Sequence, residues 1–227
     1  LSVVAVWQWG GARLFKAENM PLNSVKIESD FKHVSAVEVR QIVTPYIKDG
    51  FLDVDVQGIQ QILQAMPWIK TASVRLVWPD VLHVSLVEQK AYARWREEGL
   101  ISFEGEIFYP ASSSIPVGLP VLSGPEHSET LVLANYQPMS QSLNELELKI
   151  DRLTLDDRRA WRVTLNNGAR LLLGRSEHEN RLKKFMRYYP RVLVSENRVI
   201  EEVDLRYANG FAVRWKDMDS MQDANIS

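Results

Sequence analysis

The stretch Met66–Glu88, MPWIKTASVRLVWPDVLHVSLVE, decides the fold of the first part of this chain. Pro67 has no amide hydrogen and its ring clashes with the preceding turn, so a helix that runs up to Met66 must end there. Beyond Pro67 the apolar residues recur at every second position, which is the period of a strand with one buried face. Two such runs, separated by Pro79 and Asp80, predict an antiparallel hairpin.

A strand and a short helix are predicted upstream of this hairpin. Val25 and Ile27 alternate with charged residues, which is typical of a half-buried strand. Ser35 and Glu38 have the S-x-x-E spacing, in which two side chains satisfy the free amides at a helix start. Pro45 is expected to end this helix or to kink it near its end.

A second helix is predicted to run up to Pro67, with Asp53 or Asp55 as its cap. Its apolar residues follow the helical period and are Val56, Ile59, Ile62, Leu63 and Met66. The order is therefore strand, helix, helix, strand, strand, and we assign it to one domain over residues 23–90.

The first nine residues, Leu1 to Trp9, are almost all apolar. This run is too short to span a bilayer, which takes about 20 residues. Tryptophans beside an apolar run are typical of the outer end of a membrane helix, so we interpret residues 1–22 as such an end followed by a polar linker. A hydrophobic N-terminal strand is the alternative.

Residues 91–216 are predicted to form a β-rich domain with flanking helices. Residues 110–125 are rich in Ser, Pro and Gly and predict a surface loop with a short extended piece near Val121. A helix is expected over residues 128–146, where Pro138 predicts a kink or a break into two short helices.

The helical period continues over residues 178–189, where a second helix is predicted. Its basic residues are interpreted as a solvated face, and a docking surface for an acidic partner is the alternative. The last residues, 217–227, are polar and acidic, and we expect them to be disordered.

Two hairpins with three-residue loops are predicted in this domain, at residues 166–168 and 208–210. A two-residue Asn-Gly turn would place the apolar residues of the two strands on opposite faces, whereas three-residue loops place them on one face. The expected pairs are Leu165 with Ala169, Val163 with Leu171, Trp161 with Leu173, Tyr207 with Phe211, Leu205 with Val213 and Val203 with Trp215.

The last strand, Phe211 to Trp215, has no successor in the chain and is expected to form a sheet edge. A partner strand could satisfy the free amides and carbonyls of such an edge by β-augmentation. Phe211, Val213 and Trp215 could anchor that strand, or they could fill the core under the sheet.

Composition and motifs argue against an enzyme. The 227 residues carry a formal net charge of −2, which gives no electrostatic reason to bind nucleic acid. There is no cysteine, the four histidines are scattered, and no nucleophile elbow, phosphate loop or zinc motif is present. We therefore expect no catalytic residue, cofactor, metal or small-molecule substrate, and a hydrolase would need a pocket with convergent polar groups.

Blocks of residues from both domains, taken together, resemble the FtsQ/DivIB family of bacterial cell-division proteins. They are Pro67–Lys70, Val74–Arg75, Trp78–Asp80, Leu86–Glu88, Arg158–Trp161, Thr164–Asn167, Leu173–Arg175 and Val203–Tyr207. The resemblance implies an α+β fold, in which a POTRA domain of order β-α-α-β-β is followed by a mixed β-sheet domain with flanking helices and a C-terminal edge hairpin.

The resemblance also implies a function. Members are non-enzymatic scaffolds of the division machinery, anchored in the inner membrane by one N-terminal helix, with most of the chain in the periplasm. They bind the division proteins FtsB and FtsL, largely through a strand of FtsB added at the C-terminal sheet edge, and other division proteins through the POTRA domain. A POTRA-bearing outer-membrane insertion or secretion component is the alternative, although it would carry several POTRA units and a barrel.

Carried over by position, the partner-binding residues of the family fall on Arg158, Arg206, Tyr207, Asn209, Gly210 and Trp215. Phe211 and Val213 join them from the edge-strand argument. Asn209 replaces a serine that is common in the family, so a contact made by that hydroxyl is in doubt, while the turn itself tolerates Asn.

Overall fold

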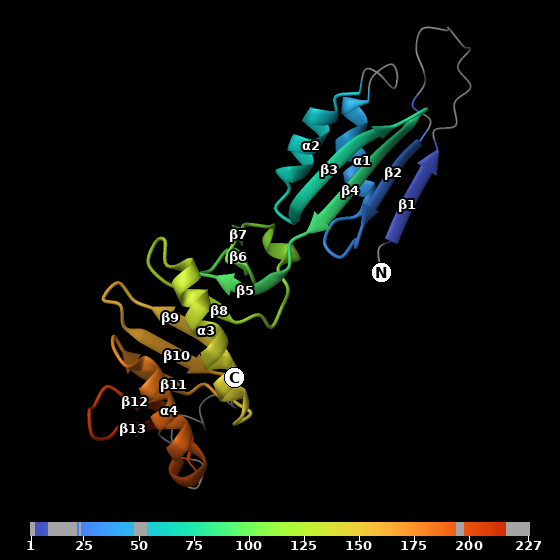
Figure 1. Ribbon diagram of the computed structural model, residues 1–227. Coiled ribbons are helices and arrows are strands. Elements are labelled where there is room, and N and C mark those ends of the chain that lie inside the picture. Colours follow the sequence, from blue (N-terminus) through green and yellow to red (C-terminus); the bar gives the residue numbers. More distant parts are fainter. Residues whose placement is uncertain (1–2, 9–21, 23, 48–53, 194–197, 217–227) are drawn as a thin grey trace, which may run out of the picture. The chain divides into compact units, whose positions relative to one another are not determined.

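The computed structural model describes residues 3–8, 22, 24–47, 54–193 and 198–216 (Figure 1). The chain forms two compact units, one of residues 1–90 with 108–115 and one of residues 91–107 with 116–227. Both mix helices with sheets, so the α+β class is confirmed. Among the helices of these described ranges, none has the length and apolar character needed to cross a membrane.

The N-terminal unit is a four-stranded sheet with two helices. Its elements are β1 (Val3–Gln8), β2 (Ser24–Ser29), α1 (Ala36–Val43), the 3₁₀ turn η1 (Thr44–Tyr46), α2 (Val56–Gln64), β3 (Ile69–Val77) and β4 (Val81–Glu88). The strand order is β1-β2-β4-β3, with β2 parallel to β4 and the other neighbours antiparallel. Both helices lie on one face of this sheet (Figure 1).

The predicted capping residues begin both helices. The Ser35 hydroxyl accepts a hydrogen bond from the Glu38 amide at 3.1 Å, and the Asp55 carboxylate accepts one from the Gly58 amide at 2.8 Å. Pro45 ends α1, because the chain tightens into η1 there. The helices bury Val39, Val43, Ile59 and Leu63 against the buried residues of β2, β3 and β4.

The N-terminal run differs from the favoured interpretation. Val3–Gln8 form a strand that pairs antiparallel with β2, from Val3 opposite Ser29 to Gln8 opposite Ser24. In this structure these residues thus form the hydrophobic strand of the alternative, and the end of a membrane helix stays a prediction. A free edge of β2 offers an apolar, β-branched segment a row of backbone partners. Most of the predicted linker lies outside the described residues.

Glu88 and Trp68 fix the loop between β2 and α1. The Glu88 carboxylate is buried and accepts hydrogen bonds from the Ser29 hydroxyl and from the amides of Lys32 and His33. The His33 ring stacks on Trp68, with centroids 3.7 Å apart, and the Trp68 indole donates to the Ser114 hydroxyl at 3.0 Å. Trp68 thus belongs to the core.

The C-terminal unit contains a nine-stranded mixed sheet. Its elements are β5 (Ala91–Trp95), β6 (Gly99–Ser102), β7 (Ile107–Phe108), η3 (Ser112–Ser114, in the segment that packs with the other unit), β8 (Val121–Ser123), α3 (Glu129–Asn144), β9 (Ile150–Leu155), β10 (Trp161–Leu165), β11 (Arg170–Gly174), α4 (His178–Tyr188), the π turn η4 (Tyr189–Leu193), β12 (Ile200–Asp204) and β13 (Ala212–Trp215). The strand order is β13-β12-β11-β10-β9-β8-β5-β6-β7.

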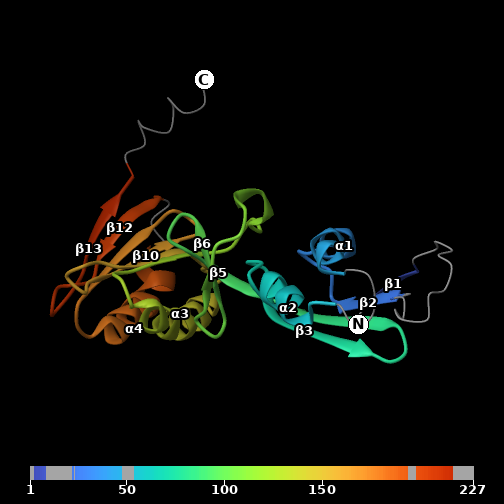
Figure 2. The ribbon, with the colours of Figure 1, turned by 90° about the horizontal axis from the view of Figure 1, so that it is seen from above.

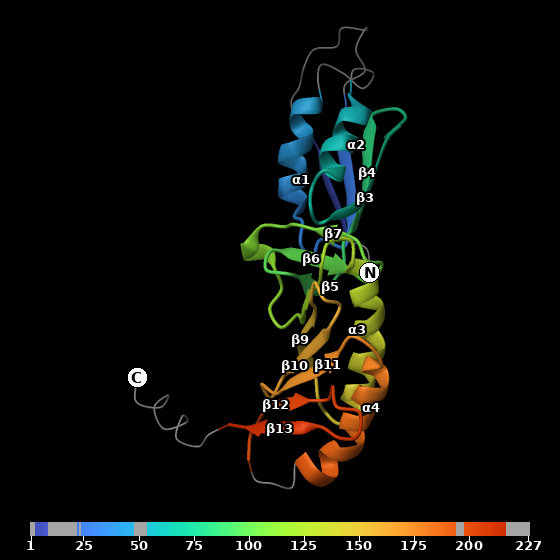
Figure 3. The same ribbon diagram turned by 90° about the vertical axis from the view of Figure 1, so that its left-hand side faces the viewer.

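Helices α3 and α4 cover one face of this sheet (Figures 2 and 3). The core between them and the strands includes Leu143, Phe185, Leu153, Val163 and Leu171, all with 0 % exposure. α3 runs through Pro138 as a single helix, so the predicted break into two helices is wrong. The opposite face is polar, and Arg170 and Arg214 form ion pairs there with Glu201 and Glu202.

The first predicted hairpin is correct except at its far end. The Leu165 amide donates to the Ala169 carbonyl at 2.9 Å, Val163 pairs with Leu171, and Gly168 has φ +81°, as a three-residue loop requires. A bulge then places Trp161 opposite Gly174 instead of Leu173. β9, which pairs with β10 on its other side, was not predicted from the sequence.

The last hairpin has a longer connection than predicted. Val203 pairs with Val213 and Asp204 with Ala212, so the connection covers residues 205–211 instead of 208–210. Beyond Asp204 the chain leaves β13, while the Leu205 amide still donates to the Leu172 carbonyl of β11, at 3.0 Å. The register is shifted by two residues, and a shift of two keeps the paired residues of β12 and β13 on their predicted faces.

A candidate partner-binding edge in the C-terminal unit

Strand β13 forms one edge of the nine-stranded sheet and pairs only with β12 among the strands that the structure describes. The Lys216 amide donates to the Val199 carbonyl at 2.8 Å, so it faces β12. Backbone amides point alternately to the two sides of a strand. Those of Val213 and Trp215 therefore face the open side, where a further strand can bond to them.

The apolar side chains of this edge pack against the core of the unit. Phe211, Val213 and Trp215 are partly buried, and the Phe211 ring lies 5.6 Å from the Tyr188 ring of α4. The Arg198 guanidinium lies over the Trp215 ring, 5.0 Å from its centroid. These side chains thus pack at the margin of the core, and their role as anchors of a partner strand stays a prediction.

The connection between β12 and β13 is held by Asp204. Its carboxylate accepts hydrogen bonds from the backbone amide of Arg206 at 3.0 Å and from the guanidinium of the same residue at 2.8 and 2.6 Å. These side-chain hydrogen bonds are the main cause that lowers the pKa of Asp204, and they raise the pKa of Arg206. Arg206 therefore stays charged and turned toward the β12 end.

Lys184 supports the same connection from α4. Its ammonium donates to the carbonyl of Ala208 at 3.1 Å and to that of Tyr207 at 3.5 Å. The Tyr207 side chain itself is 58 % exposed, so it does not join the core face as the predicted register implied. Gly210 does not adopt a positive φ, because the seven-residue connection needs no tight Asn-Gly turn.

Arg158 lies at the same end of the sheet as this connection. It is exposed in the turn between β9 and β10, which is closed by a hydrogen bond from the Asp156 amide to the Ala160 carbonyl. Trp161, at the start of β10, pairs with Gly174 at the end of β11, and Leu172 of β11 pairs with Asp204 at the end of β12. The turn that precedes Trp161 therefore lies at the same end of the sheet as the ends of β11 and β12. The separation is two to three strand spacings of about 4.8 Å.

The structure places Arg206, Tyr207, Asn209, Gly210 and Phe211 in the connection that leads into β13, Val213 and Trp215 along β13 toward its other end, and Arg158 in a neighbouring turn. Sequence reasoning missed three supporting residues, which are Asp204, Lys184 and Tyr188. The spacing of Lys184 and Tyr188, one helical turn apart, was a usable signal for a shared face. The sequence of the helix does not show which segment this face contacts.

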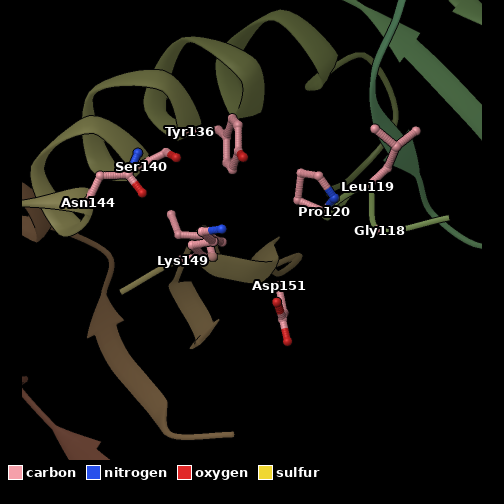
Figure 4. Close-up of a pocket in the computed structure, with 9 residues that line it drawn as sticks. Gly118, Leu119, Pro120, Tyr136, Ser140, Asn144, Lys149 and Asp151 are labelled. Carbon is pink, nitrogen blue, oxygen red and sulfur yellow. The ribbon is translucent and has the colours of Figure 1, made fainter. Parts of the chain in front are cut away.

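A surface pocket of about 510 Å³ lies elsewhere in this unit, between residues 118–120, α3 and the start of β9 (Figure 4). Its polar lining includes Tyr136, Lys149 and Asp151, and Asp151 is its only acidic residue. It therefore lacks the paired carboxylates of a glycoside hydrolase. Within the described ranges no three His, Asp or Glu side chains gather in a way that could hold a metal ion.

The sequence matches two family descriptions. Residues 93–206 match "Cell division protein FtsQ/DivIB, C-terminal", and residues 20–89 match "POTRA domain, FtsQ-type". Together the two matches take in most of both structural units.

Proteins named "Cell division protein FtsQ" are similar over most of the chain. The protein from Coxiella burnetii is 36 % identical over 90 % of this chain and 84 % of its own length. The one from Xanthomonas campestris is 38 % identical over 94 % of this chain and 75 % of its own length. The one from Burkholderia pseudomallei is 34 % identical, with coverages of 90 % and 83 %. The chain belongs to the FtsQ family of cell division proteins, and its N-terminal unit is a POTRA domain of the FtsQ type.

Proposed function

We propose that this protein is a non-enzymatic scaffold of the bacterial division machinery that binds FtsB and FtsL at the β13 edge. A strand of FtsB adds to β13 and continues the nine-stranded sheet. The observation that carries this proposal is the open side of β13, where the Val213 and Trp215 amides face away from β12.

The surroundings of β13 supply side-chain contacts for the added strand. Tyr207 is exposed at the start of the edge, and Trp215 lies partly exposed at its end. Aromatic residues and arginine are the commonest anchors of protein interfaces. Arg206, which Asp204 holds in place, offers a fixed positive charge next to Tyr207.

Asn209, Gly210 and Phe211 belong to this proposed site through their place in the 205–211 connection. Arg158 is its outlying member, because it sits at the same sheet end in a neighbouring turn. A partner that contacts Arg158 as well must extend past β13 along that end of the sheet.

The proposal includes a location and a second contact. The chain is anchored in the inner membrane through its N-terminal segment, with most of it in the periplasm at the division septum. Its POTRA unit, residues 23–90, binds other division proteins, so the protein links those that act early with those that act late. The family membership supports this part of the proposal.

A binding titration against the periplasmic segment of FtsB tests the proposal. Trp215→Ala should weaken binding by roughly 2 kcal/mol, or about thirtyfold, if the indole is an anchor. Trp78→Ala is the matched control, because Trp78 is 75 % exposed in the other unit. An unchanged affinity in a folded Trp215→Ala variant would remove Trp215 from the site, and no binding by the unaltered chain would overturn the proposal.

A further inference from the structure

Strand β2 has partners on both of its sides. β4 pairs with it in parallel, and β1 pairs with it antiparallel. The β-α-α-β-β unit is complete with β2, α1, α2, β3 and β4, so β1 is a fourth strand added at its edge (Figure 1). The edge of β2 therefore accepts a strand, and in this structure it accepts residues 3–8 of the same chain.

This pairing cannot coexist with membrane anchoring by the same residues. A helix that spans or enters a bilayer satisfies its backbone hydrogen bonds internally, because lipid offers none. Strand β1 instead bonds its backbone to β2 over six paired positions. If Val3–Gln8 lie in the membrane, as the proposed function implies, β2 has an open edge.

We propose that the outer edge of β2 is a second strand-acceptor site, which β1 occupies only while residues 3–8 are outside the membrane. In the anchored protein this edge takes an extended, uncharged and β-branched segment of a protein partner, antiparallel to β2. The inference rests on the proposed anchoring, but the acceptor property of β2 is tested independently of it.

The chemistry of the occupant follows from β1 and β2. The segment that occupies the edge reads VVAVWQ and carries no charge. The two charges on β2 already satisfy each other, since the Lys26 ammonium lies 2.8 Å from the Glu28 carboxylate. Val25 and Ile27, at the alternate positions, are 1 % and 0 % exposed. A charged partner strand would therefore find no unpaired opposite charge on β2, so an uncharged strand fits this edge better than a charged one.

The two acceptor edges then differ in character. The β13 edge is bordered by Lys184, Arg206 and Arg214, and its connection is polar. At the β2 edge the Glu28 carboxylate is paired with Lys26 and lies 3.3 Å from the His83 ring, whereas the Lys184 ammonium beside the β13 edge binds to neutral carbonyl oxygens. A scaffold with two such edges can hold two different strands without exchanging them, because the positive charge at one edge discriminates between ligands.

An engineered disulfide provides a reversible lock for the β2 edge. Val6 lies directly opposite Lys26, and the chain has no cysteine of its own. Directly opposed antiparallel positions bring Cβ atoms within the range of a disulfide. Val6→Cys with Lys26→Cys should therefore cross-link β1 to β2 on oxidation and close the edge.

The main test is a titration with a labelled synthetic peptide that contains VVAVWQ. Ala5→Pro with Trp7→Pro should open the edge. The Ser24 amide donates to the Asp80 carbonyl beside β4, so by alternation the amides of Ala5 and Trp7, opposite Ile27 and Val25, are those that face β2, and proline removes them. We expect this variant to bind the peptide at least tenfold more tightly than the unaltered chain or the oxidised lock. Equal affinity in all three would overturn the proposal. If the proline variant does not fold, Val4→Gly with Val6→Gly weakens β1 without a steric clash and carries the same expectation.

Peptides methylated at alternate backbone amides show whether strand pairing is the mode of binding. One set of amides faces β2 and the other faces away, so exactly one of the two methylated peptides should lose binding. Loss with both or with neither contradicts pairing at the edge. Val213→Pro in the same chain should leave peptide binding unchanged, and a loss there would assign the peptide to β13 instead.

The proposal that β1 leaves β2 in the anchored protein is tested in membranes of cells that produce the double-cysteine protein. We expect little cross-linking between positions 6 and 26 there and full cross-linking in the detergent-free soluble chain. Full cross-linking in the membrane would overturn the proposal, since the edge would be permanently occupied. The FtsB titration at β13 does not depend on that result, so the two proposals fail separately.

Discussion

Asp204 and Arg206 are bound to each other by three hydrogen bonds, although they lie only two residues apart. The carboxylate that ends β12 thereby turns the chain out of the ladder and holds the guanidinium at the sheet corner. These hydrogen bonds thus fix the position of a proposed partner-binding charge at the start of the connection to β13.

Replacement of Arg206 should be visible in the titration of Asp204. Arg206 lowers the pKa of Asp204 from its ordinary 3.8, so the folded carboxylate binds fewer protons than the unfolded one in acid. Its contribution to stability is present above that ordinary value and is lost as the pH falls through the lowered pKa. In Arg206→Gln, carboxyl carbon NMR should show the pKa of Asp204 rise toward 3.8. A pKa that stays low would assign the shift to other groups.

Proline at Val213 should block strand addition with little damage to the fold. The Val213 amide faces the open side of β13, and a proline is tolerated at an edge when the lost amide faces outward. The variant loses one intermolecular hydrogen bond of about 1.4 kcal/mol, and the proline ring obstructs the added strand. Both effects should weaken FtsB binding, by tenfold or more in total.

Two matched variants make that result specific. Val213→Ala keeps the amide and should bind almost as well as the unaltered chain. Arg214→Pro removes an amide that faces β12, so it should lower thermal stability instead. If Val213→Pro binds FtsB normally, the partner does not pair with this edge.

Acidification should weaken the packing of α4 through His178. Burial is the main cause that lowers the pKa of His178, whose Nε2 lies 2.7 Å from the Asn135 amide oxygen and whose ring contacts Trp161. Its Nδ1 is buried without a partner, so protonation leaves a charge there unsatisfied. Glu179 opposes this shift and Arg181 adds to it.

The sign follows from proton binding. The unfolded His178 binds protons more readily than the folded one, so stability is fully present above about pH 6.5 and falls as the pH drops toward the lowered pKa. Denaturant unfolding at a series of pH values should show this loss, and His178→Gln should reduce it. An identical pH profile in both proteins would exclude His178 as its source.

Loss of Glu88 should destabilise the N-terminal unit. The buried carboxylate accepts from Ser29, Lys32 and His33, and its removal leaves two backbone amides without their acceptor. We expect Glu88→Ala to cost about 2–3 kcal/mol in denaturant unfolding. Glu28→Gln, on the exposed face of the same sheet, is the control and should change stability much less. Equal effects would mean that Glu88 contributes only as a surface charge.

Local signals predicted the two helices of the N-terminal unit correctly. Ser35 and Asp55 cap α1 and α2 as their spacing predicts, and Pro45 and Pro67 lie where the helices give way to other structure. A cap or a helix-ending proline acts within one turn of the chain, so a short window of sequence contains the whole interaction.

Strand pairing was predicted less well. β9 was missed because Ile150, Leu153 and Leu155 do not alternate strictly, and its place depends on β8 and β10. The register of the β12–β13 hairpin differs from the prediction by two residues. Asn209 and Gly210 predict a tight turn, but the chain forms a seven-residue connection in which Leu205 bonds to β11.

The sequence by itself determined most of the helices and strands, the faces they bury and the family, since these follow from period, caps and blocks of neighbouring residues, whereas it missed β9 and favoured a helix end over the strand β1. Only the tertiary structure decided the register of β13 on β12, that Asp204 holds Arg206 there, and that β1 occupies the edge of β2. The reason is physical: backbone hydrogen bonds between strands carry no residue identity, so the partner of a strand is chosen by the packing of the whole sheet.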